Sequence, residues 1–211
     1  MNRRSTLAII REYTKALLLA LVLAFVIRVT VVEAYRIPSG SMENTLLVGD
    51  RLFANKFIYG ASLPLTHLRL PPLREPGIGD VIIFRYPEDM KTAFVKRVVA
   101  VAGQSVAVRN KRVFVDGRPV ADAPGVKHDD PRVIPPLAGS RDYFGPITVP
   151  PGYLFVMGDN RDNSYDSRYW GLLDTRLVLG KAEVIFWSWD DDPWVPLLHR
   201  VRWERIGHRL G

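Results

Sequence analysis

The chain contains no cysteine among its 211 residues. A disulfide framework, a cysteine nucleophile and a thiolate metal site are therefore excluded, although the absence fits either side of a membrane. Histidine is also scarce. None of the four histidines stands in a compact motif beside a serine or aspartate, or at metal-ligand spacing; they are His67, His128, His199 and His208. We therefore expect no metal site and no cofactor.

Nucleic-acid-binding motifs are absent as well, although the formal net charge is +7. No helix-turn-helix, zinc-finger or RNA-binding signature accompanies that charge, so we expect no nucleic-acid partner. A positive net charge is also compatible with binding to an anionic lipid surface. Proline and glycine number 16 each, which favours many short strands and turns over long helices.

Only one long apolar run is present, at residues 16–27, and it resumes after Arg28. Crossing the hydrocarbon core takes about 20 residues, a length reached at Ala34 if Arg28 extends its charge to the interface. Two interpretations stay open. Residues 16–34 form a transmembrane anchor, or they belong to a cleaved signal peptide with its cleavage site near Ala34.

Basic residues precede this run: Arg3, Arg4, Arg11 and Lys15, opposed by Glu12. The positive-inside rule keeps such an end in the cytoplasm. We therefore expect residues 1–15 to be cytoplasmic and the chain after about residue 34 to lie on the outer face of the membrane.

After Tyr35 the sequence alternates short apolar runs with turn residues, which is typical of antiparallel β-structure. Asp116-Gly117 predicts a tight hairpin turn. Residues 121–145 are rich in Pro, Asp and Gly and predict a loop or a weakly structured insertion. The predicted fold is mostly β, with antiparallel sheets preceded by one N-terminal transmembrane helix. Residues 35–104 and 146–211 would form the main β-domain, with a small hairpin insertion at 105–145.

Lys96 has an unusual position for a lysine. Strand alternation places it on the apolar face with Phe94 and Val98, whereas Arg97 falls on the opposite face. One of two adjacent cations must then point into apolar surroundings, and desolvation there lowers the pKa of a lysine. A neutral amine can accept a proton from a serine hydroxyl, so Lys96 is a candidate general base. The alternative is a solvated surface lysine.

A polar segment, GDNRDNSYDSRYWG at residues 158–171, follows an apolar strand. It does not fit a calcium loop, because the sixth position from Asp162 is not glycine and the twelfth is not glutamate. A polar network that supports an active site fits better. Within it Asp166 and Arg168 can pair, and Ser164 can orient a neutral amine.

The order of PSGSM at residues 38–42, Lys-Arg in a strand and GDNRDNSYDSRYWG resembles bacterial signal peptidase I, a membrane-anchored family of Ser-Lys dyad serine proteases. The resemblance covers nearly the whole chain after Arg11. It implies a catalytic β-domain that cleaves N-terminal signal peptides from exported preproteins after small residues, at an A-x-A type site. One departure is Asn44, where many members carry proline.

The resemblance also implies roles for individual residues. Ser41 would be the nucleophile and Lys96 the general base, with Ser39 and the Ser41 N–H as the oxyanion hole. The supporting residues would be Ser164, Asp166, Arg168 and Asp159. The substrate-binding residues would be Ile37, Met42, Leu46, Phe94 and Val95.

The implied partners are signal peptides and the lipid bilayer, and the implied working form is a monomer in the bacterial cytoplasmic membrane. Ser41 would lie near the outer interface, since the segment from Ala34 reaches at most about 25 Å. Two alternatives remain. A self-cleaving protease of the SOS-repressor type shares a Ser-Lys dyad, but it is soluble and cytoplasmic. A catalytically silent, membrane-anchored β-domain that binds exported proteins has no reason to carry Lys96 in register with the serine motif.

Overall fold

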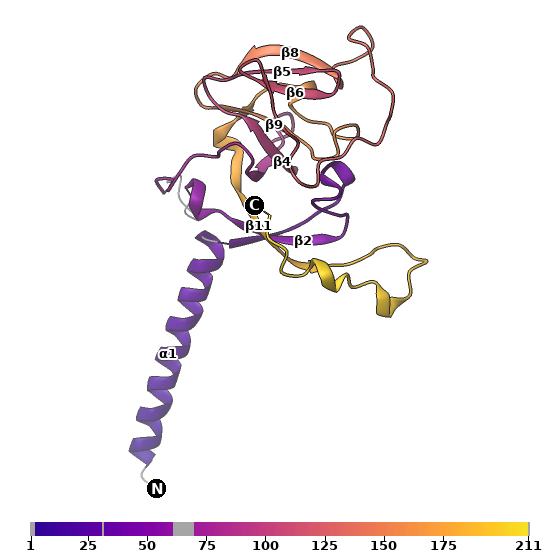
Figure 1. Ribbon diagram of the computed structural model, residues 1–211. Coiled ribbons are helices and arrows are strands. Elements are labelled where there is room, and N and C mark those ends of the chain that lie inside the picture. The colour runs from indigo at the N-terminus through magenta and orange to yellow at the C-terminus, as the bar shows by residue number, and fades with distance from the viewer. Residues whose placement is uncertain (1–2, 31, 61–69, 211) are drawn as a thin grey trace.

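The computed structural model describes residues 3–30, 32–60 and 70–210 of the chain. A long helix, α1 (Arg3–Thr30), projects from a β-rich body (Figure 1). The sequence predicted a transmembrane helix over residues 16–34. The helix ends earlier, because Val32–Arg36 forms strand β1. Within the described part of the chain, no helix is both long and apolar enough to cross a membrane.

The larger sheet has seven strands, and every neighbouring pair in it is antiparallel. In spatial order these are β1 (Val32–Arg36), β2 (Asp50–Asn55), β11 (Val178–Ser188), β3 (Val81–Arg85), β4 (Ala93–Ala100), β9 (Tyr153–Met157) and β10 (Leu173–Asp174). The prediction of a mostly β, antiparallel fold is confirmed.

The smaller sheet has four strands, in the order β7 (Arg118–Pro119), β6 (Arg112–Val115), β5 (Ser105–Arg109) and β8 (Tyr143–Thr148). Asp116 and Gly117 both have positive φ, at 52° and 75°, as a two-residue hairpin turn requires. The predicted turn is therefore present. Strand β8 continues past residue 145, the predicted end of the insertion.

The remaining helices are short. They are η1 (Gly40–Met42), η2 (Phe57–Tyr59), α2 (Ser167–Trp170), η3 (Thr175–Leu177), η4 (Leu197–His199) and η5 (Trp203–Arg205).

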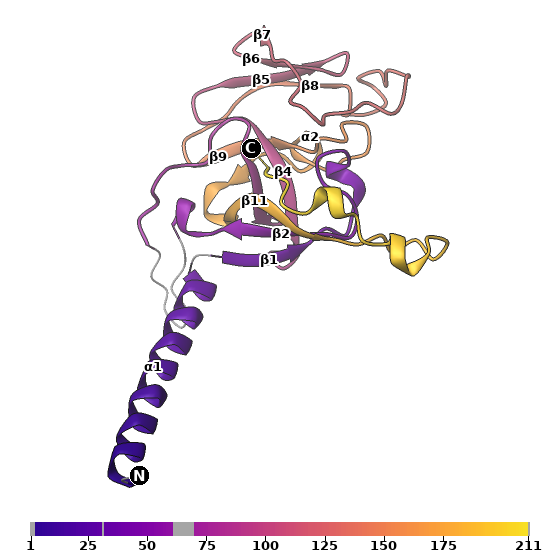
Figure 2. The ribbon, with the colours of Figure 1, turned by 60° about the horizontal axis from the view of Figure 1, so that its bottom comes forward.

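The two sheets share a hydrophobic core. Val106 and Val113 of the smaller sheet pack with Ala100, Phe155 and Met157 of the larger one. Figure 2 shows the smaller sheet as a layer above β4 and β9. The insertion is thus held to the rest of the fold by apolar burial, which stabilises the assembly by roughly 25 cal/mol per Å² of buried apolar surface.

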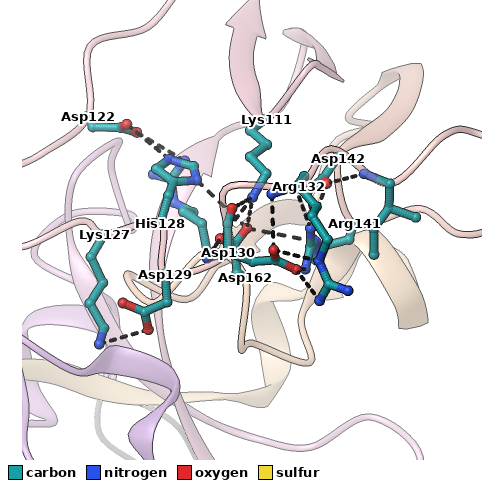
Figure 3. Close-up of polar contacts among 12 residues, drawn as sticks. Lys111, Asp122, Lys127, His128, Asp129, Asp130, Arg132, Arg141, Asp142 and Asp162 are labelled. Carbon is teal, nitrogen blue, oxygen red and sulfur yellow. Dashed lines mark hydrogen bonds and ion pairs between the residues drawn. The ribbon is translucent and has the colours of Figure 1, made fainter.

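Residues 121–142 contain no strand or helix but are tied to the body by ion pairs. Figure 3 shows Lys111, Arg141 and His128 directed toward the carboxylates of Asp130 and Asp162. Asp122 Oδ1 lies 3.1 Å from Arg161 Nη1, and Lys127 Nζ lies 3.0 Å from Glu43 Oε2, so both pairs join the segment to the rest of the fold. Charge pairing therefore orders a segment that the sequence predicted to be a loop or weakly structured.

Candidate active site

The loop that carries Ser41 is pinned on both sides by buried apolar residues. Ile37, Met42 and Leu46 are at most 3% exposed and belong to one core cluster. The single turn η1 places Ser41 directly before Met42, and Leu46 N donates to Met42 O at 2.7 Å. Burial of the flanking side chains therefore holds Ser41 in a fixed position at the edge of the core.

Lys96 lies on β4, opposite Ile82 of β3, and is 3% exposed. Its Nζ atom lies 2.6 Å from Ser41 Oγ, within hydrogen-bonding distance. Burial lowers the pKa of Lys96 to about 8 from the ordinary value of 10.5, although the Asp166 carboxylate opposes that change. Ser41 thus faces an amine that loses its proton much more readily than a solvated lysine.

Arg97, the adjacent cation, is also buried. It makes a two-point ion pair with Asp159, with Nε 2.9 Å from Oδ1 and Nη2 2.7 Å from Oδ2. Thr45 Oγ1 donates to the same carboxylate at 2.5 Å. The pattern of alternating faces identified the apolar setting of Lys96 but missed Arg97 and Thr45 as partners of Asp159. The only signal for Arg97 in the sequence was its position next to Lys96.

Asp166 and Arg168 form the predicted pair, and both are at most 3% exposed. Arg168 donates to Asp166 from Nε at 2.9 Å and from Nη2 at 2.8 Å. Burial raises the pKa of Asp166, but the charge of Arg168 and its hydrogen bonds outweigh burial, so the pKa lies below the usual range. This carboxylate stays ionised behind Lys96.

Ser164 is 6% exposed and lies beside the Asp166 carboxyl group, whose pKa it helps to lower. Among the described residues its hydroxyl makes no hydrogen bond to Lys96. Gly158 separates Ser164 from the nucleophile loop. A Cβ atom on Gly158 would lie 2.2 Å from Ser164 Oγ and 2.4 Å from Ser41 O, so only glycine allows these two segments to approach this closely.

A groove of about 420 Å³ runs beside Ser41 and Lys96. Residues 35–42 form one wall and residues 92–96 the other, with Asn163 and Tyr165 completing the lining. Ser39 lines it in an extended conformation. The structure therefore brings most of the predicted substrate-binding residues to one groove. Leu46 is the exception, because it is fully buried in the core and does not line the groove.

The described histidines lie elsewhere, since none of His128, His199 and His208 lines this groove. His67 lies outside the described residues. In the described ranges, no group of three or more His, Asp or Glu side chains is placed to hold a metal ion. The groove is lined by the Ser41 hydroxyl and the buried Lys96 side chain, and two buried ion pairs, Arg97–Asp159 and Arg168–Asp166, lie nearby.

Known proteins match nearly all of this chain. The family described as "Signal peptidase, peptidase S26" matches residues 10–187. "Signal peptidase I" of Pseudomonas aeruginosa is 35% identical over 210 residues, which cover 85% of this chain and 73% of that protein. "Probable signal peptidase I-1" of a Synechocystis species is 39% identical over 181 residues, which cover 82% of this chain and 80% of that protein.

Proposed function

Because the chain belongs to the signal peptidase family, peptidase S26, and is a serine peptidase that cleaves signal peptides, we propose that Ser41 is its nucleophile and Lys96 its general base. The 2.6 Å approach of Lys96 Nζ to Ser41 Oγ supports this assignment most directly. A lysine pKa of about 8 supports it as well, since the amine is then partly neutral at physiological pH.

The proposed reaction follows from this pair. The neutral amine of Lys96 accepts the Ser41 hydroxyl proton while Oγ bonds to the substrate carbonyl carbon. The resulting ammonium group then donates a proton to the leaving amide nitrogen, and the C–N bond breaks to leave an acyl-enzyme. Lys96 next takes a proton from water, whose oxygen attacks the ester carbon. The ammonium group then returns this proton to Ser41 Oγ as the C–O bond breaks, which releases the peptide acid and restores the neutral amine.

The negative oxygen of each tetrahedral intermediate needs donors aimed at it. We assign these donors to the Ser39 hydroxyl and the Ser41 backbone N–H. The place of Ser39 in the same groove as Ser41 supports this assignment.

The buried polar residues behind Ser41 and Lys96 would keep the charges near the Lys96 amine balanced. Asp166 stays ionised by pairing with Arg168, and Asp159 neutralises Arg97, so none of these four charges is left unpaired near the amine. We propose that Ser164 orients the neutral amine once Ser41 turns toward its substrate. The burial of Ser164 beside Asp166 is compatible with this role.

The groove suits an extended peptide. Strand β9 pairs with the described part of β4 only from Arg97 onward, so residues 93–96 keep an open edge that can pair with a substrate strand. Apolar walls from Ile37, Met42, Phe94 and Val95 leave room for small side chains, which supports cleavage after A-x-A type sites.

We also propose that the apolar run that begins at residue 16 anchors the enzyme as a single pass in the bacterial cytoplasmic membrane, with its N-terminus cytoplasmic and the catalytic domain on the outer face. Leu17, Leu18, Leu19 and Leu21 are 57–61% exposed on α1, and a lipid environment would cover such side chains. The chain should remain in the membrane fraction after alkaline carbonate extraction, and recovery in the supernatant would contradict the anchor. A single chain supplies every group named above, so we propose that the monomer is active.

Processing of a preprotein by the wild type and by Ser41→Ala tests the proposed function. The wild type should release the mature protein with a new N-terminus after a small residue, identified by N-terminal sequencing. Ser41→Ala should fold and release none. Retained cleavage by Ser41→Ala would contradict the assignment of the nucleophile.

A further inference from the structure

Residues 122–130, here called the strap, run from the smaller sheet to the two loops that meet at Ser41. The backbone of the strap is bonded to the loop after β9. Lys127 N donates to Asp159 O at 2.8 Å, and Arg161 N donates to Lys127 O at 3.0 Å. The strap therefore borders the chain on both sides of Asn160.

Asn160 in turn holds the nucleophile loop. Its backbone N–H donates to Ser41 O at 3.1 Å, and its side-chain amide donates to Gly40 O at 3.2 Å. The same amide lies 3.3 Å from Glu43 Oε2. Asn160 is only 1% exposed, so its bonds to the backbone of the nucleophile loop are largely shielded from water. Displacement of Asn160 would therefore move the Ser41 peptide.

The side chain of Lys127 also contacts the nucleophile loop, through Glu43. Its Nζ atom lies 3.0 Å from Glu43 Oε2 and 2.8 Å from Asp129 Oδ2. Figure 3 shows the pair with Asp129. Lys127 thus contacts the nucleophile loop through its amine and the Asp159–Arg161 segment through its backbone.

Close packing reinforces this contact. Gly125 of the strap has a φ of +92°, and a Cβ atom there would lie 2.5 Å from Thr45 Oγ1. Thr45 Oγ1 donates to Asp159, the partner of Arg97. The strap therefore lies directly against the residues that connect the serine loop to the strand carrying Lys96.

We propose that Lys127 is a positioning residue for Ser41, which holds the nucleophile loop in register with Lys96 through Glu43 and Asn160. This inference rests on the proposed function of Ser41. The ammonium group of Lys127 also balances the Glu43 carboxylate, whose Oε2 lies 3.6 Å from the site of a Cβ on Gly40. An unbalanced carboxylate there would oppose the oxyanion that forms next to Gly40.

The test compares Lys127→Ala with Lys127→Arg, which keeps the charge, and with Arg132→Ala as matched control. Arg132 belongs to the same polar network, but its side chain is 84% exposed and pairs with Asp130. Two rates are measured: kcat on a preprotein, and the pre-steady-state release of p-nitrophenol from a short peptidyl p-nitrophenyl ester. The ester reports Ser41 acylation without the full substrate.

Lys127→Ala should lower both rates about fivefold, the size expected for a partly exposed ion pair, with KM and the unfolding temperature nearly unchanged. Lys127→Arg should restore most of the loss, and Arg132→Ala should behave as the wild type. Acylation by Lys127→Ala at the wild-type rate would overturn the proposal. So would a fall in activity that only follows the folded fraction.

A double variant keeps the proposal testable if Lys127→Ala folds poorly. Glu43→Gln removes the other half of the ion pair, and Lys127→Ala/Glu43→Gln should lose no more kcat than the more damaged single variant. Multiplied losses would overturn the proposal. If Ser41→Ala is inactive while Lys127→Ala acylates normally, only the role of Lys127 fails. If Ser41→Ala still cleaves, the proposed function itself fails.

Discussion

Arg97 and Asp159 form a buried two-point ion pair at the position next to Lys96, with the Arg97 side chain 8% exposed and the Asp159 side chain fully buried. The two consecutive basic residues of β4 therefore have different partners. Arg97 is neutralised by a carboxylate, whereas Lys96 faces the Ser41 hydroxyl. This separation lets the strand bury two basic residues and still leave one amine able to lose its proton.

Breaking that pair should destabilise the fold. Asp159→Asn leaves the Arg97 guanidinium buried without its counter-charge, which costs about 3–5 kcal/mol of unfolding free energy. Urea denaturation measures this loss. Asp159→Asn/Arg97→Met, which removes both charges, should be more stable than Asp159→Asn alone. Arg176→Ala, which breaks an exposed pair with Asp174, should leave the urea midpoint nearly unchanged. An equally small effect of Asp159→Asn would contradict the structural importance of the buried pair.

Replacing Lys96 should stop catalysis without unfolding the chain. Lys96→Ala removes the proposed base and should lower kcat by at least about 10²–10⁴-fold, the usual contribution of a general base. The fold should persist, because a small apolar residue is compatible with this buried site. Initial rates of preprotein cleavage and circular dichroism measure the two effects. Lys91→Ala, an exposed lysine on the same hairpin, is the matched control, and near-wild-type cleavage by Lys96→Ala would contradict the dyad.

The pH dependence should report the same lysine. A general base works only when it is neutral, so kcat/KM should rise with pH through about 8, the lowered pKa of Lys96. The pKa in the folded state lies below that in the unfolded state. The unfolded chain therefore binds more protons between about pH 8 and 10.5, and the contribution of Lys96 to stability increases over that window. Chemical denaturation of the wild type and of Lys96→Met at several pH values measures it, and the same pH slope in both variants would contradict the lowered pKa.

Local patterns in the sequence predicted the apolar setting of Lys96 and the pairing of Asp166 with Arg168, whereas the role of Ser41 came from the family resemblance. Strand alternation alone placed Lys96 in apolar surroundings, and the spacing within residues 158–171 allowed Asp166 and Arg168 to pair. Both relationships depend on neighbours in the chain. The partner of Arg97 is Asp159, which is distant in sequence, and no periodicity indicates such a contact. Leu46 was assigned to the groove by resemblance, whereas its burial in the core depends on tertiary packing.

The strap was the least predictable part for a similar reason. Its polar composition predicts a loop or weak structure, since little apolar area is available to offset the entropy of ordering. The order comes instead from charges that meet only in the folded chain, such as Asp122 with Arg161. The end of α1 at Thr30 was missed because residues 32–34 are as compatible with a helix as with strand β1, and pairing of Ala34 with Phe53 decides the outcome.

Ser39 provides the sharpest test of the proposed oxyanion hole. Its side chain is exposed at the groove, so Ser39→Ala should leave the unfolding temperature unchanged. Loss of one oxyanion donor should lower kcat about 10²–10³-fold while KM changes little, because the hydrogen bond forms only in the transition state. Steady-state kinetics on a preprotein separates the two constants, and Ser39→Thr, which keeps a hydroxyl, should retain much more activity than Ser39→Ala. If Ser39→Ala instead raises KM with kcat unchanged, Ser39 binds the substrate in its ground state and is not an oxyanion donor.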